Sequence, residues 1–330
     1  MAEAIREIIR ENEISHNYSS LKNIEILGGR YQKNGLSNLG ELMQCLPLKV
    51  LSINTKGKFC WIELDQHWYI SFTFGMSGAI YYEPTEGILH DYSIQNGKSI
   101  TREEYMKHFH VKFETTNNKC FYYGDIRRFG TITIAHNRSV LDKKLSELGP
   151  DMLTGPPITD EEFIRILRQP KFNTKNICKT LMSQKPVSGI GNYIKSEILY
   201  ECHINPWALV SDIDDQTLIH LHHSIREIAL NAYRGHGATL YTYSGTRREK
   251  GTFQNLLKVY GKDVDPYGNK VIQIHERISP DKRTTHYVPS IQTIGNQRDP
   301  PMITPPHLMT LHILTPPKRK LVIKMKTNTP

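Results

Sequence analysis

The 330-residue sequence has no long hydrophobic run, because its apolar stretches stay well short of the roughly 20 residues that a membrane-spanning helix needs. Its first segment, Met1 to Asn12, is charged from the start and does not resemble a secretory signal. We therefore expect an intracellular protein without a membrane partner.

Cysteine is also scarce, and its spacing argues against two kinds of site. The number of cysteines is odd, and no two of them stand in a CxxC arrangement. A disulfide framework and a cysteine metal site are both unexpected, and a reducing compartment is favoured. We expect most of the thiols to be small core residues. They are Cys45, Cys60, Cys120, Cys178 and Cys202.

Acidic residues are fewer than basic ones, 33 against 42, which gives a formal net charge of +9 and favours a polyanionic partner. Much of the excess lies in residues 294–330, where six basic residues and one acid give +5, leaving 9 − 5 = +4 for the rest. Bulk charge alone does not identify that partner as DNA.

Hydrophobic patterning divides the chain into a sheet-forming half and a helical half. A helix over Ala4–Glu13 is followed, from Lys22 to about Ile134, by short alternating or apolar runs that predict an antiparallel β-sandwich. The first domain, residues 1–155, ends at the turn-rich Gly155-Pro156-Pro157. The predicted strands include Lys49–Ile53, Phe59–Leu64, Trp68–Phe74, Val111–Thr115 and Thr131–Ile134.

Helical signals begin after this junction, so the fold class is α+β. A capping-box pattern from Thr159 to Glu162 opens a helix over Glu161–Gln169. We predict a helical domain over 156–255, a segment of short strands and turns over 256–293, and a basic, proline-rich disordered tail over 294–330. Further helices are predicted over Thr174–Gln184, Asn192–Cys202 and Asp215–Tyr233.

The segment Pro186–Asn192 carries the clearest binding signal. Gly189 and Gly191 precede Asn192 at the start of a helix, where unpaired backbone N–H groups and the helix dipole favour a phosphate. Taken alone, the same segment could be an ordinary turn between helices.

The longer stretch Leu181–Leu199 closely resembles the helix-two-turn-helix of the formamidopyrimidine-DNA glycosylase/endonuclease VIII family. Further matches follow in the family's order: Thr55–Leu64, Phe74–Gly78, Asp125–Gly130, Gly237–Leu240 and Phe253–Gly261. The resemblance implies a DNA glycosylase with AP lyase activity that removes oxidised bases from damaged double-stranded DNA. It also implies DNA in the cleft between the domains, a monomer and no cofactor.

The resemblance assigns roles to individual residues. Lys58 falls on the family's lyase lysine, and Arg283 on an arginine of the C-terminal finger that acts near the lesion. Met76, Arg127 and Phe129 fall on the wedges that fill the base stack after the damaged base is extruded, which offsets lost stacking. Without this context, Met76 would be read as a core residue and Arg127 as part of a surface ion pair.

Several residues are candidates for holding the DNA backbone. Asn192 and Arg127 are expected to bind phosphates. His108 is either a third phosphate ligand or a strand residue facing solvent, and Lys262 is either a phosphate contact or a solvated surface lysine. We read the cluster His220, His222 and His223 as solvated helix histidines, not as a metal site, because no further ligand is close in sequence.

The C-terminal segment departs from relatives that bind zinc through two CxxC pairs. Val288 and Ile291 fall where the second pair would lie, and Asp265–Asn269 replaces the first. Side chains suited to a small hydrophobic core have taken the place of metal ligands. The pattern resembles the zincless-finger branch, which includes animal and large-DNA-virus endonuclease VIII-like enzymes, so no metal is expected.

The beginning of the sequence also departs from the family, whose terminal proline amine attacks the sugar C1′ and forms a Schiff base. This sequence begins Met1-Ala-Glu-Ala. We expect that the start is truncated. The alternatives are that Ala2 is a weak nucleophile, or that the chain is a catalytically impaired, lesion-binding paralogue. A lysine such as Lys58 would be a poor replacement if it were an ordinary protonated surface residue.

Overall fold

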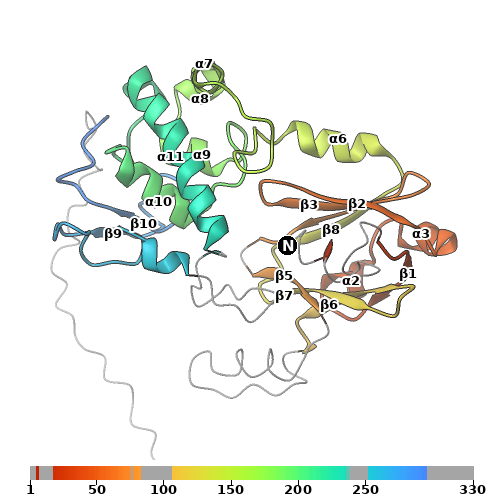
Figure 1. The fold of residues 1–330 in the computed structure, drawn as a ribbon. Helices are drawn as coiled ribbons and strands as arrows, with labels where there is room; N and C mark the ends of the chain where they lie inside the picture. Colours follow the sequence, from red (N-terminus) through yellow and green to blue (C-terminus); the bar gives the residue numbers. More distant parts are fainter. Residues whose placement is uncertain are drawn as a thin grey trace, which may run out of the picture.

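The computed structural model describes residues 5–6, 18–75, 77–82, 106–235, 237 and 252–295. They form two lobes, a β-sandwich and a helical lobe that carries a short hairpin (Figure 1). Within these residues, none of the helices combines the length and the apolar character needed to cross a bilayer.

The first lobe is a sandwich of two four-stranded antiparallel sheets, as predicted. One sheet has the strand order β1-β6-β7-β5, and the other has the order β2-β3-β4-β8. The predicted run Phe59–Leu64 coincides with β3. The strands are β1 Leu21–Ile26, β2 Val50–Lys56, β3 Phe59–Leu64, β4 Tyr69–Thr73, β5 Gly78–Tyr82, β6 Phe109–Thr115, β7 Cys120–Asp125 and β8 Thr131–Ala135.

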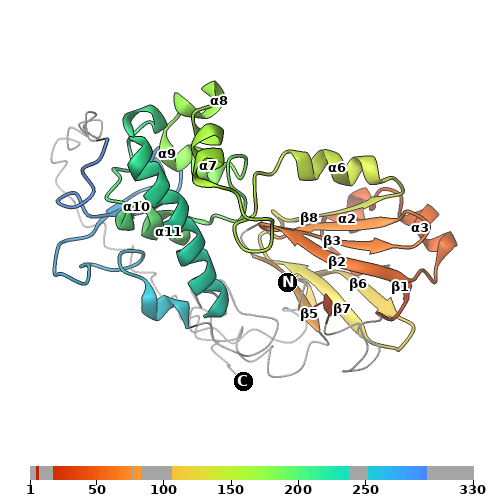
Figure 2. The same ribbon diagram turned by 45° about the horizontal axis from the view of Figure 1, so that its top comes forward.

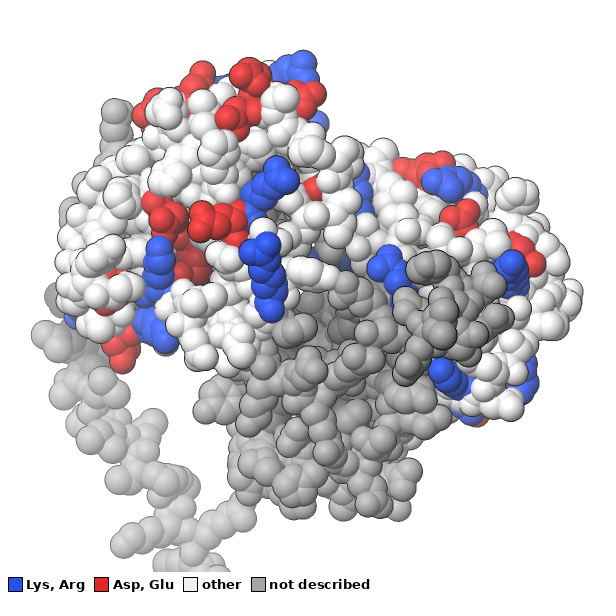
Figure 3. Space-filling view, in the orientation of Figure 1, with Lys and Arg blue, Asp and Glu red and all other residues white. Residues whose placement is uncertain are grey.

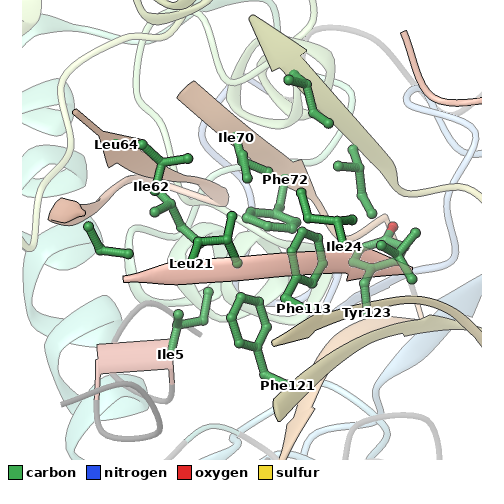
Figure 4. Close-up of a cluster of buried hydrophobic side chains, with 14 of the residues drawn as sticks. Ile5, Leu21, Ile24, Ile62, Leu64, Ile70, Phe72, Phe113, Phe121 and Tyr123 are labelled. Carbon is green, nitrogen blue, oxygen red and sulfur yellow. The ribbon is translucent and has the colours of Figure 1, made fainter. Parts of the chain in front are cut away.

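Cross-strand rows of apolar side chains fill the space between the sheets. One row crosses β2-β3-β4-β8 through four buried isoleucines, Ile53, Ile62, Ile70 and Ile134, because the strand registers place them opposite one another. Phe72 and Phe113 then meet edge to face across the sheets, with ring centroids 5.7 Å apart (Figure 4). Because successive side chains of a strand point to opposite faces of the sheet, alternating apolar residues all face the space between the sheets and form a single core.

The N-terminal helix predicted over Ala4–Glu13 lies outside the described residues except for Ile5 and Arg6, which are helical. Ile5 is fully buried in the sandwich core. The Arg6 guanidinium donates a hydrogen bond to the backbone oxygen of Ile53 on β2, with Nε 2.9 Å away.

Three helices of the first lobe were not predicted: α2 (Arg30–Asn34), α3 (Leu39–Cys45) and α6 (Arg138–Ser146). The first two are shorter than the two turns over which a helical period becomes visible. Helix α6 lies along the outer face of the sheet that contains β2 and β3, as Figures 1 and 2 show. There Leu141 packs against Phe59 and Tyr69.

The helical lobe has its own hydrophobic core. The predicted capping box is confirmed, since the Thr159 hydroxyl accepts from the Glu162 N–H and the Glu162 carboxylate accepts from the Thr159 N–H. The helix predicted over Thr174–Gln184 was wrong at its start, because the chain forms α8 first and Asn176 then caps α9. The helices are α7 Asp160–Leu167, α8 Pro170–Asn173, α9 Ile177–Met182, α10 Asn192–Glu201 and α11 Asp215–Arg234.

The hairpin beyond the helices consists of β9 (Ile272–Ile274) and β10 (Thr285–Tyr287), and β10 packs against α10. Val288 is fully buried beside Tyr200 of α10, and Ile291 packs against the same cluster. The expectation of a small hydrophobic core at these two positions is confirmed. The disordered tail predicted over 294–330 was wrong at its start, because Ile294 forms an isolated parallel bridge with Ile204. Residues 296–330 lie outside the described residues.

Candidate active site

The turn between β2 and β3 is the point where the first lobe is hydrogen-bonded to the helical lobe. The Gly57 N–H donates to Asp151 Oδ2 over 2.7 Å, and Lys58 Nζ donates to the Ile190 backbone oxygen over 2.6 Å. Gly57 has a φ of 58°, and a Cβ at this position would lie 2.6 Å from the Gly189 nitrogen. Only glycine allows this close approach between two backbones.

Asp151 was not singled out from the sequence, although it follows the turn-forming Gly149-Pro150 in the segment that joins the lobes, where it pairs with Ser188 of the helical lobe. Burial alone would raise the pKa of its carboxyl group, but N–H donors from Gly57, Leu153 and Thr154 outweigh burial and hold the pKa below its usual value. Asp151 is therefore an anionic acceptor that holds the β2–β3 turn in place.

Lys58 differs from an ordinary surface lysine in its electrostatic surroundings. Its side chain is exposed as a whole, but the ammonium group is desolvated where it donates to the Ile190 backbone oxygen of the helical lobe. This desolvation, followed by repulsion from the nearby Arg283 guanidinium, lowers the pKa of Lys58 to about 8. An appreciable fraction of the amine is therefore neutral near physiological pH, where it can accept a proton.

Arg283 lies in the loop that precedes β10. Its side chain is exposed, and its backbone N–H lies 3.3 Å from Asp281 Oδ1. The charge of Arg283 is close enough to depress the pKa of Lys58. The structure thus brings together two residues 225 positions apart (283 − 58), which the sequence linked only through the family resemblance.

Asn192 is the first residue of α10, but its side chain does not cap the helix. Its Nδ2 donates to the Thr284 backbone oxygen over 2.7 Å, next to Arg283, while its Oδ1 is buried without a partner among the described residues. Because an amide nitrogen carries two hydrogens, one N–H remains for a second acceptor such as a phosphate. Asn192 therefore also links the start of α10 to the Arg283 loop.

A second part of the site is made by two loops at the rim of the sandwich. The Asp125 carboxylate is 1% exposed; it accepts from the Ser77 hydroxyl over 2.5 Å and from the Gly130 N–H over 2.7 Å. The Ser77 hydroxyl in turn accepts from the Arg127 N–H over 2.9 Å. These bonds join the two loops that hold the predicted wedge residues.

The wedge candidates project from this framework. Phe129 is 63% exposed, a large apolar side chain in contact with water, and Arg127 is also exposed. Met76 lies outside the described residues. Asp125 was missed as a functional residue, although it is the first residue of the recognised Asp-Ile-Arg-Arg-Phe-Gly segment and a charged residue at the end of a buried strand.

The remaining backbone-contact candidates differ in their surroundings. His108 is half-buried in the turn before β6, so its reading as a solvent-facing strand residue was wrong. Burial, followed by the charges of His110 and Arg128, lowers the pKa of His108, which favours the neutral ring at physiological pH. Lys262 is exposed in the turn after Tyr260. Figure 3 shows Lys and Arg side chains bordering the hollow between the two lobes.

The histidine cluster on α11 was only partly predicted. His222 is buried and bonds through Nδ1 to Asp160 Oδ1 over 2.6 Å, and His223 approaches the same oxygen at 3.0 Å. The reading of His222 as a solvated helix histidine was therefore wrong, because Asp160 comes from a helix 62 residues away. In the described part of the chain, this trio is the one group of metal-ligating side chains close enough to share an ion.

Two family models match the chain, one to each lobe. The formamidopyrimidine-DNA glycosylase N-terminal domain matches residues 26–132, and the formamidopyrimidine-DNA glycosylase H2TH domain matches residues 148–244. The first range covers most of the sandwich, and the second covers the loop before α10 together with α7 to α11.

Curated relatives and solved structures agree with these matches. The chain is 31% identical over 293 residues to a formamidopyrimidine-DNA glycosylase of Arabidopsis thaliana, covering 88% of this chain and 70% of the relative. It is 31% identical over 189 residues to that of Lactobacillus johnsonii, covering 57% of this chain and 67% of the relative.

The fold is similar to that of a Lactococcus lactis FPG mutant in complex with a Fapy-dG containing DNA. That comparison gives a TM-score of 0.68 at 23% identity, over 88% of this chain and 97% of the other. The same organism's Fpg with an abasic site containing DNA gives a TM-score of 0.67, also at 23% identity and with the same coverage.

Proposed function

The chain belongs to the formamidopyrimidine-DNA glycosylase family of base excision repair enzymes, and from this membership we propose that it excises oxidised bases from duplex DNA and cleaves the resulting abasic site as an AP lyase. The observation that supports this proposal most directly is that Lys58 and the Arg283 loop are both hydrogen-bonded to the start of α10, close enough for the charge of Arg283 to act on Lys58. A lysine with a pKa near 8 and an arginine beside it suit a reaction that moves protons next to a phosphate.

We propose that DNA lies along the hollow between the lobes and that the damaged base is turned out of the stack. Arg127 and Phe129, with Met76, would occupy the space that the base leaves, because planar and apolar side chains restore part of the lost stacking. The Asp125 hydrogen bonds keep the loops of these wedges together, so the duplex meets a preformed surface.

In the proposed reaction an amine attacks the sugar C1′ and the base leaves. The C1′–O4′ bond of the adduct then opens, with a proton taken up by O4′, and leaves a Schiff base at C1′. The Schiff base makes a C2′ hydrogen acidic, and loss of that proton breaks the C3′–O bond, so that the phosphate leaves. We assign Lys58 to the proton transfers of this elimination and Arg283 to the phosphate that departs. Asn192 and Arg127, with His108 and Lys262 as further candidates, would hold the neighbouring backbone phosphates.

The test of the proposed function uses the full chain and three matched duplexes: one with a single oxidised base, one undamaged, and one of RNA. We expect base release and strand cleavage only with the first. Binding to a duplex with an abasic analogue should weaken with salt by about 0.9 log unit per log unit for each neutralised phosphate. A flat salt slope or equal affinity for RNA would contradict a DNA site in the hollow. Tight lesion binding without base release would favour the lesion-binding paralogue.

We also propose that residues 256–293 form a finger of the zincless kind, following a sandwich domain over 1–155 and a helical domain over 156–255. Where relatives that bind zinc carry their first CxxC pair, Asp265 accepts hydrogen bonds from the Tyr200 hydroxyl at 3.0 Å and from the N–H groups of Tyr267 and Asn269 at 2.9 and 2.8 Å. A carboxylate closes this turn, so the turn needs no metal.

The purified chain should therefore contain no stoichiometric zinc, and EDTA should leave its melting temperature unchanged. Metal analysis and a thermal unfolding curve with and without chelator are the measurements. One zinc per chain that persists in the His222→Ala variant would overturn the zincless finger, since that variant removes the separate Asp160 and histidine group on α11.

A further inference from the structure

Lys195 on α10 is fully buried, and so is its partner. Its Nζ donates to Asp281 Oδ2 over 2.5 Å and to Thr285 Oγ1 over 3.0 Å, and the side chains of Lys195 and Asp281 are 0% and 2% exposed. Removing two charges from water is costly, and well-packed apolar residues often stabilise a fold at least as well. Stability is therefore a weak reason for an ion pair at this position.

The contacts around the pair show which part of the chain it fixes. Asp281 Oδ1 accepts from the Ser279 hydroxyl over 2.8 Å and lies 3.3 Å from the Arg283 N–H. The Thr285 hydroxyl donates to the Arg283 backbone oxygen over 3.2 Å. The two groups that Lys195 holds therefore bond to the peptide groups on both sides of Arg283, so that Lys195 restricts where the guanidinium can reach.

Residues at the start of α10 also hold the other parts of the site in place. Asn192, one turn before Lys195, bonds to the Thr284 backbone oxygen, and the Ile190 backbone oxygen two residues earlier accepts from Lys58. The lysine from the sandwich and the arginine from the hairpin are thus both placed against the same few residues. A change in the Arg283 loop would alter its distance to Lys58.

We propose that Lys195 is a positioning residue for strand cleavage, which acts through Asp281 to hold Arg283 opposite Lys58. Lys195 has no exposed surface, so it does not touch DNA itself. The inference rests on the proposed lyase function and names the residue that sets the geometry of its arginine. A small displacement of an aligned catalytic group lowers the rate by up to about 100-fold, so we expect an effect of that size on the cleavage rate when the contacts of Lys195 are lost.

The main test replaces the pair by neutral side chains of similar size, Lys195→Met with Asp281→Asn, because either change alone leaves an unpaired buried group. Single-turnover cleavage of an abasic duplex is measured with enzyme in excess, together with the dissociation constant of an abasic-analogue duplex. We expect the cleavage rate to fall by about 10- to 100-fold while the dissociation constant changes by less than about threefold. Loss of binding and rate by the same factor would overturn the proposal.

The mechanism through Arg283 is tested by repeating the pair replacement in an Arg283→Ala chain. If Lys195 acts by placing Arg283, the replacement has no further effect once the guanidinium is gone. An undiminished effect in that background shows a merely structural role and overturns the proposal.

A milder variant, Thr285→Val, keeps the shape of the side chain and removes the hydroxyl. This variant tests the proposal if the double variant does not fold. It should slow cleavage in the wild-type chain and not in the Arg283→Ala chain, and any other pattern contradicts the proposal. A Lys195 and Asp281 double variant that retains base release but loses strand cleavage supports the proposal. A wild-type chain without either activity would instead refute the proposed function.

Discussion

Replacing Lys58 by methionine should lower the rate of strand cleavage at an abasic site by at least about 100-fold, the lower end of what a positioned proton carrier contributes. Binding of the same duplex should fall much less, because Lys58 is one of several cations around the hollow. The matched control is Lys56→Met at the end of β2, because the Nζ of Lys56 donates to the Leu145 backbone oxygen of α6 instead. That variant should cleave at nearly the wild-type rate.

The pH dependence of cleavage provides a second test of Lys58. Because the pKa of Lys58 is lowered to about 8, the neutral fraction of its amine rises steeply with pH below that value, is one half at it and approaches one above it. The single-turnover rate should therefore rise with pH and level off above about 8. Lys58→Arg should lack this rise, since a guanidinium does not lose its proton in this range. A rise that persists in Lys58→Arg would assign the titration to another group.

Gly57→Ala should both destabilise the chain and slow cleavage. The residue has a φ of 58°, and its new Cβ would lie 2.6 Å from the Gly189 nitrogen and 2.8 Å from Ser188 Cβ. The nearest of these neighbours is a backbone atom, which cannot turn away as a flexible side chain can. We expect a loss of about 2 to 5 kcal/mol in the free energy of unfolding, from left-handed strain plus overpacking. Cleavage should fall by about 10-fold or more as Lys58 moves away from the Ile190 oxygen.

Gly35→Ala is the control for this change. Gly35 has a φ of 71°, but a Cβ there would meet nothing within 4 Å. Its ψ of −179° places it in a backbone region almost confined to glycine, so alanine there carries backbone strain alone, about 1 to 3 kcal/mol, and should leave the cleavage rate unchanged. Thermal or denaturant unfolding and single-turnover cleavage of both variants are the measurements. Equal losses in the two variants would show that the approach of Gly57 to Gly189 is not tight in solution.

Local sequence signals predicted the elements whose pattern repeats over several residues. The alternation in Phe59–Leu64 placed β3 at its observed bounds, and the Thr159 capping box placed the start of α7 within one residue. Helices α2 and α3 were missed because five to seven residues contain too little of a helical period. The start of α9 was placed too early because the Asn176 side chain caps the helix, accepting from the Lys179 N–H, and so begins it at Ile177.

Residues of the site were predicted only where they belong to a sequence motif of the family. Lys58 and Arg283 could be named from the family's pattern, but nothing in the sequence shows that they meet. Lys195 lies in a helix and would be read as a surface lysine, yet its partner Asp281 is 86 residues away. Residues such as Lys195 acquire their burial and charge from contacts distant in sequence, and no local period encodes such contacts.

The contact between the two lobes at the β2–β3 turn is polar, and this affects how a DNA duplex can enter between them. The bonds described at the β2–β3 turn, from Gly57 to Asp151 and from Lys58 to Ile190, are hydrogen bonds, whereas the hydrophobic cores lie separately within each lobe. Hydrogen bonds exchanged for bonds to water change the free energy little, but exposing a core costs far more. The two lobes can therefore separate and close again around a duplex without exposing the hydrophobic core of either lobe to water.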